Sequence, residues 1–331
     1  MKQNYNLPII DTLRGLAAMS VCLFHYICKT KDYVKDEMVL SFFDFGHYGV
    51  QMFFVISGIV IPLSMMIGNY EYGAWFRFLK KRFIRIEPPY LVSILIAIAY
   101  LSLRNYIPGV ENSADLRPSL SNVLFHLGYL VPFIKGTQWI NPVYWTLAIE
   151  FQYYLCLSLL FPLVLSGNWK KRSLFYLILC VSHTVLLGFG HYFIVYWFPL
   201  FLMGIIYTLW RFQKVQVLEY AIVTAICSFL VIYHIGWIDW AAGAVTLAII
   251  YFFENFRTPI TKFFGDISYS VYLVHTITGA PVINWLSHRY TEPYQKFLVI
   301  SLGISIAVGC AYLMYKFVEL PSKKWASSIK Y

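Results

Sequence analysis

The sequence predicts an all-α integral membrane protein, a polytopic bundle of about ten transmembrane helices that forms a single domain over residues 1–331. The composition is the first observation: 59% of the residues are hydrophobic, 19% are aromatic and 13% are charged, whereas soluble domains carry about 25% charged residues. The second observation is that the apolar residues form runs long enough to cross a bilayer. Together they exclude a soluble, disordered or coiled-coil chain.

Ten apolar segments account for most of the chain. Most of them have about 20 residues, the length that an α-helix needs to cross the hydrocarbon core. The segments 193–210 and 238–253 are short enough to be half-helices. The expected helices are 7–28, 48–67, 84–103, 143–165, 173–189, 193–210, 217–235, 238–253, 267–287 and 297–318.

The distribution of positive charge predicts the orientation. When alternate connections are assigned to one side, the side of the N-terminus carries 15 Lys and Arg residues and the opposite side carries eight. By the positive-inside rule, both the N- and the C-terminus are then cytoplasmic. The first apolar run, from Leu7, carries Asp11 and Arg14 and lacks a cleavage pattern, so we expect a helix rather than a signal peptide.

The cysteines and the net charge exclude several kinds of site. The six cysteines all lie within or at the ends of apolar runs, without CxxC or Cys/His spacing, so we expect small buried side chains and no metal site. The net charge of +10 comes from Lys and Arg clusters between apolar segments, which favour anionic lipid or an anionic ligand. No feature indicates nucleic-acid binding.

One connection is long. Residues 104–142 are polar at first and then weakly apolar around Ser121–Phe133. Long loops in compact proteins are often functional. We expect a short interfacial or re-entrant helix here, and a candidate lid or acceptor site.

Two ionisable residues in the first segment are candidates for function, because such groups are costly inside lipid. Arg14 and His25 are eleven residues apart, so they share one helix face about 16 Å apart along the axis. Asp11 lies close enough along the helix to pair with Arg14. A histidine in an apolar helix can equally be a hydrogen-bonded packing residue, and both interpretations stay open.

Two further polar groups occur within apolar segments. Glu150 must pair, become protonated or face a wet cavity, and a salt bridge to Arg14 is the structural alternative. Ser268, Tyr272 and His275 follow one another at helical spacing and share a face. These groups either line a pocket or join neighbouring helices by hydrogen bonds.

A basic run precedes the third apolar segment. It consists of Arg77, Lys80, Lys81, Arg82 and Arg85 and leads into Glu87-Pro88-Pro89, where we expect a proline break. The run either orients the chain and contacts lipid headgroups, or binds a phosphate-bearing ligand at the membrane surface.

Six segments, in order, resemble the integral-membrane acyltransferase 3 family, and the resemblance covers essentially the whole chain. Each segment is a weak signal alone, whereas all six in sequence are a strong one. They are Leu13-Arg14-Gly15-Leu16-Ala17-Ala18 with His25; Gly49-Val50-Gln51-Met52-Phe53-Phe54-Val55-Ile56-Ser57-Gly58; Lys81-Arg82-Phe83-Ile84-Arg85-Ile86-Glu87-Pro88; Trp145-Thr146-Leu147-Ala148-Ile149-Glu150-Phe151; Ser268-Tyr269-Ser270-Val271-Tyr272-Leu273-Val274-His275; and Val318-Glu319-Leu320-Pro321.

The resemblance implies an O-acyltransferase of the cell inner membrane. It would move an acyl group, usually acetyl from acetyl-CoA, to a hydroxyl of a surface polysaccharide or glycolipid. The chain resembles the stand-alone form of the family, without a C-terminal soluble domain. Neither the acceptor sugar nor the oligomeric state follows from the resemblance.

The same resemblance implies roles for individual residues. His25 would be the general base or acyl relay, Arg14 would orient the site or hold the donor, and Glu150 would shape the catalytic site. The cofactor-binding residues would be Lys81, Arg82 and Arg85, which would contact the phosphates of coenzyme A, and Tyr269, Tyr272 and His275.

The orientation adds a geometric expectation. With the N-terminus inside, Arg14 lies in the cytoplasmic half and His25 lies near the outer end of its helix. We therefore expect acyl-CoA at the cytoplasmic surface, its pantetheine arm within the bundle, and the acceptor entering from the opposite face.

Two other functions are compatible with the composition. A transporter or flippase for a lipid-linked or small polar substrate would use Arg14, Glu150 and His25 as an ion or substrate path. The absence of a detectable repeat between the two halves argues against it. A non-catalytic scaffold would need no fixed spacing between Arg14 and His25.

Overall fold

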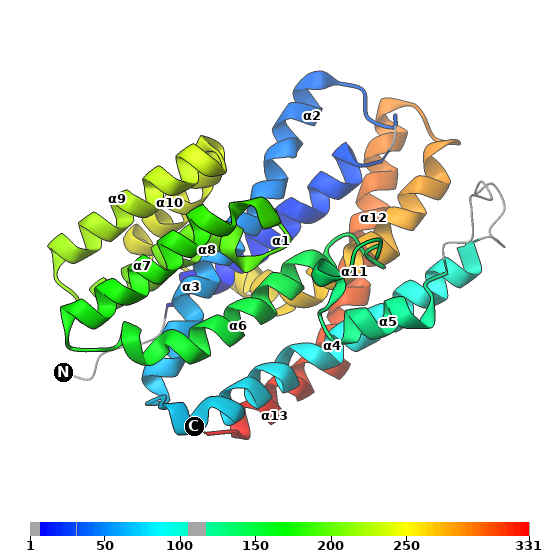
Figure 1. Ribbon diagram of the computed structural model, residues 1–331. Helices are drawn as coiled ribbons and strands as arrows, with labels where there is room; N and C mark the ends of the chain where they lie inside the picture. Colours follow the sequence, from blue (N-terminus) through cyan, green and yellow to red (C-terminus); the bar gives the residue numbers. More distant parts are fainter. Residues whose placement is uncertain (1–6, 31, 105–116, 331) are drawn as a thin grey trace.

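The computed structural model describes residues 7–30, 32–104 and 117–330, and within these ranges every regular element is a helix and no strand occurs. The all-α prediction is therefore confirmed. The helices are α1 (Ile9–Cys28), α2 (Glu37–Asp44), α3 (Gly49–Ile67), α4 (Trp75–Leu103), α5 (Leu120–Leu127), α6 (Tyr144–Val164), α7 (Trp169–Leu186), α8 (Ile194–Arg211), α9 (Val217–His234), α10 (Trp237–Phe252), α11 (Pro259–Ser287), α12 (Pro293–Met314) and α13 (Leu320–Ser328) (Figure 1).

Each of the ten expected segments coincides with one long helix. Among the described residues, seven helical stretches are both long and apolar enough to cross a membrane. Three of these ten helices are not among the seven. α10 is apolar but too short, and α1 and α11 carry charged residues. The number of membrane crossings and the cytoplasmic location of both termini stay predictions.

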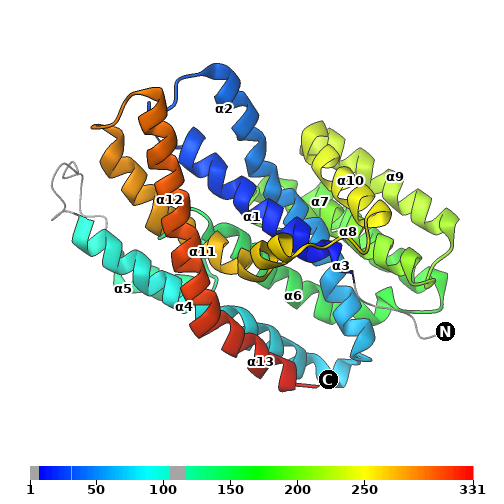
Figure 2. The same cartoon turned by 180° about the vertical axis from the view of Figure 1, so that it is seen from behind.

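The helices form a bundle with α1 near its middle. Figures 1 and 2 show α7, α9 and α10 on one side of α1, and α4, α5, α12 and α13 on the other. They also show α2 and α13 toward opposite ends of the bundle. The helix that carries Arg14 and His25 therefore lies within the bundle, packed mainly against α11 and α3.

Two glycine contacts set the distances between the central helices. At the crossing of α1 with α11, a Cβ atom on Gly265 would lie 2.3 Å from the Asp11 carbonyl oxygen. At the crossing of α3 with α8, a Cβ atom on Gly204 would lie 2.3 Å from the Val55 carbonyl oxygen. Small residues let helix backbones approach closely, which is a common way to pack helices in membranes.

The proline break expected after Arg85 is absent, and α4 runs without interruption through Pro88 and Pro89. The helix also begins at Trp75, nine residues before the expected start, so Arg82 and Arg85 lie within it. Proline lacks an N–H and normally disrupts a helix, but helices packed among others can satisfy the freed backbone groups. Next to this site, Tyr269 of α11 donates a hydrogen bond of 2.9 Å to the Ile86 carbonyl oxygen.

The helix expected around Ser121–Phe133 is present as α5, followed by a 3-10 turn at Val131–Phe133. His126 of α5 is fully buried. Its carbonyl oxygen accepts a hydrogen bond from Tyr90 of α4, and its Nε2 accepts one from the Ile140 N–H. The first bond joins α5 to α4, and the second joins α5 to the segment before α6. Most of the preceding loop, residues 105–116, lies outside the described residues.

The last expected segment, 297–318, ends too early. A π-helical turn at Tyr315–Glu319 joins α12 directly to α13, which continues to Ser328. π-helical turns inside α-helices are rare and are often found at functional sites. Here the turn places Glu319, which is almost fully buried, against α11.

Candidate active site

A pocket with an excess of cationic side chains lies between α1, α3, α4, α6, α8, α11 and α13. Its space not filled by protein atoms amounts to about 980 Å³. We call it the basic pocket, because Arg14, Arg82, Arg85 and Lys323 line it together with only two carboxylates, Glu150 and Glu319.

Arg82 is the most notable of these cations. Its side chain is only 3% exposed, and its Nε and Nη2 atoms have no hydrogen-bond partner. The guanidinium lies 5.3 Å from the centre of the Phe78 ring and 5.8 Å from that of Tyr154. A buried charge without a counter-ion is costly. The position is therefore suited to an anionic ligand.

The two carboxylates of the basic pocket bind other partners. Glu319 forms an ion pair with Lys323 (2.7 Å) and accepts a hydrogen bond from Ser270 (2.5 Å). Glu150 accepts a hydrogen bond from Tyr154. Within the described ranges no carboxylate forms an ion pair with Arg14, Arg82 or Arg85.

The salt bridges considered for α1 are thus not formed. Asp11 lies 3.4 Å from Arg257 rather than pairing with Arg14. Glu150 does not form an ion pair with Arg14 either. Instead it accepts a hydrogen bond from the Tyr154 hydroxyl, one turn further along α6. Arg14 is therefore directed at the pocket and is not occupied by a structural ion pair.

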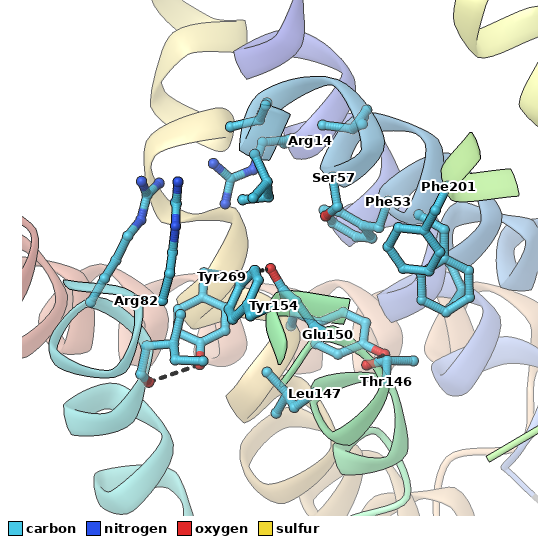
Figure 3. A pocket seen from close by; sticks show the side chains of 18 of the residues that line it. Arg14, Phe53, Ser57, Arg82, Thr146, Leu147, Glu150, Tyr154, Phe201 and Tyr269 are labelled. Carbon is cyan, nitrogen blue, oxygen red and sulfur yellow. Dashed lines mark hydrogen bonds between the residues drawn. The ribbon is translucent and has the colours of Figure 1, made fainter. Parts of the chain in front are cut away.

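The basic pocket has a charged end and an apolar end. Figure 3 shows Arg82 at one end, Arg14 near the middle above Tyr154 and Tyr269, and Phe53 and Phe201 at the other end. A long ligand with an anionic head and a less polar tail would fit this gradient.

A second pocket contains His25 and about 930 Å³ of space not filled by protein atoms. We call it the histidine pocket. Three histidines, two further polar residues and five large aromatic side chains are among the residues that line it: His25, His47, His191, Gln51, Asp239, Phe24, Trp145, Tyr196, Trp197 and Tyr272. Such a mixture of aromatic surfaces and hydrogen-bonding groups is typical of sites for polar organic ligands.

Gln51 carries an unsatisfied group in the histidine pocket. Its Nε2 donates a hydrogen bond of 2.6 Å to Asp239, which fixes the orientation of the amide. The Oε1 atom is buried and has no partner, and the side chain is 5% exposed. A buried acceptor without a partner costs about 1–3 kcal/mol. A ligand hydroxyl would satisfy it.

The two pockets meet at Val50 and Tyr272, which line both. The Tyr272 hydroxyl lies 2.8 Å from the Thr146 hydroxyl, and its ring packs edge to face on Phe53. The junction thus adjoins Phe53, at the apolar end of the basic pocket.

The structure brings most of the predicted residues to these pockets. Arg14, Arg82, Arg85, Glu150 and Tyr269 line the basic pocket, His25 lines the histidine pocket, and Tyr272 lines both. Arg14 and His25 share a helix face, as the spacing predicts, but face different pockets.

Three predicted residues lie elsewhere. Lys81 lines neither pocket. His275 is fully buried and lines neither pocket. It contacts His25, with 3.2 Å between its Nε2 and the Nδ1 of His25. Ser268 is buried and donates to the Gly265 carbonyl oxygen, so it joins helix turns rather than lining a pocket.

The sequence analysis did not single out Asp239, His47, His191 or Lys323. A carboxylate at the start of the 238–253 segment was the available signal for Asp239. In the described ranges, no group of three or more His, Cys, Asp or Glu side chains is arranged to hold a metal ion.

Comparison with known proteins identifies the family. The family model of acyltransferase 3, described as an acyltransferase domain, matches residues 7–316. The chain belongs to the acyltransferase 3 family. The membership and the apolar helices together indicate a multi-pass membrane protein.

Two relatives illustrate the range of the family. A protein of Staphylococcus aureus (strain COL) named "Putative O-acetyltransferase" is 22% identical over 96% of this chain and 57% of its own length. The acyltransferase MdmB of Streptomyces mycarofaciens is 29% identical over 48% of this chain and 40% of its own length. This chain thus spans little more than half the length of the Staphylococcus relative. No solved structure matches it significantly.

Proposed function

We propose that the chain is a membrane-embedded O-acyltransferase of the inner membrane. It takes an acyl group, acetyl in the first instance, from acyl-CoA on the cytoplasmic side. It transfers this group to a hydroxyl of a carbohydrate in a surface polysaccharide or glycolipid. One observation carries the proposal: a pocket with unpaired arginines meets, at Tyr272, the pocket that contains His25.

The basic pocket supports an acyl-CoA donor. It offers Arg82, Arg85 and Arg14, none of which forms an ion pair with a carboxylate among the described residues, which suits the phosphates of coenzyme A. Its apolar end at Phe53 and Phe201 suits the thin pantetheine arm and leads toward Tyr272. In this arrangement the thioester reaches the junction of the two pockets.

The histidine pocket supports a carbohydrate acceptor. Aromatic rings such as Trp145 and Trp197 offer apolar faces for a sugar ring, and Gln51 offers its free acceptor oxygen to a sugar hydroxyl. The location at the outer end of α1, given cytoplasmic termini, favours an acceptor from the opposite side of the membrane.

The chemistry uses His25 of the histidine pocket and Tyr272 at the junction. His25 takes the proton of the acceptor hydroxyl as its oxygen attacks the thioester carbonyl carbon. The hydroxyl of Tyr272, which lines both pockets, stabilises the oxygen that gains negative charge. The carbon–sulfur bond then breaks, and the thiolate of coenzyme A leaves and takes up the proton held by His25.

Native membranes that contain the protein test the proposal. Supplied with labelled acetyl-CoA, wild-type protein transfers label to glycan or glycolipid, and His25→Ala protein present in equal amount does not. Equal labelling by both proteins would exclude His25 as the base. Absence of both labelling and coenzyme A binding would favour a transporter.

A further inference from the structure

His25 makes two contacts through one ring nitrogen. Its Nδ1 lies 2.9 Å from the Val21 carbonyl oxygen and 3.2 Å from Nε2 of His275. A carbonyl oxygen only accepts hydrogen bonds, so Nδ1 of His25 carries a hydrogen. Its Nε2 makes no hydrogen bond with any part of the chain that the structure describes.

The same reasoning fixes the tautomer of His275. Its Nδ1 lies 3.0 Å from the Val271 carbonyl oxygen and therefore donates. In a neutral ring the lone pair is then on Nε2, the atom that faces His25. His275 thus presents an acceptor to the Nδ1–H of His25.

Within the proposed function, we propose that His275 is a positioning residue that holds His25 in its Nδ1–H tautomer. This tautomer leaves the lone pair of His25 on Nε2, available to the acceptor hydroxyl in the histidine pocket. A third group plays this part in serine hydrolases, where it orients the imidazole that acts as the base. Here the group is a neutral imidazole from a helix 250 residues away in the sequence.

The surroundings of His275 support a fixed role. The side chain is 0% exposed and lines neither pocket. Its own backbone carbonyl accepts a hydrogen bond of 2.8 Å from Tyr26, one residue after His25. This second bond between α1 and α11 keeps the two rings in register. When His25 accepts a proton at Nε2, its Nδ1–H still has two acceptors to share the positive charge.

Two substitutions separate the hydrogen bond from the packing. His275→Phe fills the space but offers no acceptor, whereas His275→Gln keeps an amide oxygen that can reach the place of Nε2. With labelled acetyl-CoA and native membranes, we expect His275→Phe to lower the saturated transfer rate about 100-fold, within the range of general-base effects. We expect an unchanged KM for acetyl-CoA. His275→Gln should recover most of the rate.

A second histidine pair provides a matched control. His183 is also fully buried, its Nδ1 lies 2.9 Å from the Val195 carbonyl oxygen, and its Nε2 lies 3.0 Å from His234. It lines neither pocket. His183→Phe should therefore leave the transfer rate close to that of the wild type, although it disrupts a similar pair.

The tautomer itself can be measured without any acceptor. Solid-state NMR of protein labelled with ¹⁵N-histidine distinguishes the two tautomers, and the signal of His25 is the one lost in His25→Gln. We expect Nδ1–H in the wild type and in His275→Gln. In His275→Phe only the Val21 carbonyl still accepts from Nδ1, so we expect a measurable share of the other tautomer. A wild-type tautomer and rate in His275→Phe would overturn the inference, as would equal rate losses in both variants with Nδ1–H retained. A wild-type protein that transfers no label would instead count against the proposed function.

Discussion

The guanidinium of Arg82 lies 5.8 Å from the centre of the Tyr154 ring, and the hydroxyl of that same tyrosine donates a hydrogen bond to Glu150. Tyr154 thus separates a buried cation from the carboxylate on its own helix. Because Glu150 is held by the hydroxyl, the arginine keeps its positive charge available for a ligand. The relationship gives a physical reason for a pocket with unpaired arginines inside an apolar bundle.

Arg82→Gln tests the role of this charge. We expect the KM for acetyl-CoA to rise at least tenfold, because a charge-assisted hydrogen bond to phosphate is worth about 1.5–3 kcal/mol. The protein without ligand should not lose thermal stability, because the substitution removes an unpaired buried charge. Steady-state kinetics and a melting curve in detergent measure both effects. Lys170→Gln, on the exposed start of α7, is the matched control. If this variant showed an equal rise in the KM for acetyl-CoA, the assignment of Arg82 to the donor site would be refuted.

The phosphates of the donor can be varied in the same way. We expect dephospho-coenzyme A, which lacks one phosphate, to bind more weakly than coenzyme A to the wild type. The difference should shrink in Arg82→Gln or Arg85→Gln, whichever contacts that phosphate. Calorimetry with purified protein measures it. Equal affinities of the wild type for both compounds would show that this phosphate lies outside the basic pocket.

Gln51→Met tests the histidine pocket separately from the donor site. The substitution keeps the approximate volume but removes both the hydrogen bond to Asp239 and the free acceptor oxygen. We expect transfer to fall about tenfold, because one hydrogen bond to the acceptor is lost, while coenzyme A binding is unchanged. If coenzyme A binding fell and transfer at saturating donor did not, Gln51 would belong to the donor site.

Gly265→Ala tests the close contact between α1 and α11. The new Cβ atom would lie 2.3 Å from the Asp11 carbonyl oxygen, so the helices must move apart. We expect a loss of about 1–3 kcal/mol in stability, as for other overpacked sites. Gly309→Ala on α12 is the control, because a Cβ atom there meets nothing within 4 Å. Melting temperatures in detergent that fall equally for both would contradict the close contact.

The helices could be predicted because apolar runs of fixed length are recorded directly in the sequence. Arg14 and Glu150 could also be predicted, since a charged residue within such a run stands out. Arg82 could be predicted only as part of the basic run before the third segment. The uninterrupted course of α4 through Pro88 and the π-helical turn before Glu319 could not. Both depend on packing against other helices, which a local pattern does not contain.

The same limit applies to contacts between distant residues. The pair of Gln51 with Asp239 joins residues 188 apart, and that of His25 with His275 joins residues 250 apart. Helical spacing showed that His275 shares a face with Tyr272. It did not show that His275 contacts His25 instead of lining the basic pocket.

The most direct test of the account measures coenzyme A binding and acyl transfer in the same preparations of wild-type, His25→Gln and Arg82→Gln protein. The account predicts that His25→Gln binds coenzyme A like the wild type but transfers no label. It predicts that Arg82→Gln binds weakly yet transfers when acetyl-CoA is in large excess. Transfer by His25→Gln at the wild-type rate would contradict the account, and so would wild-type protein that does not bind coenzyme A.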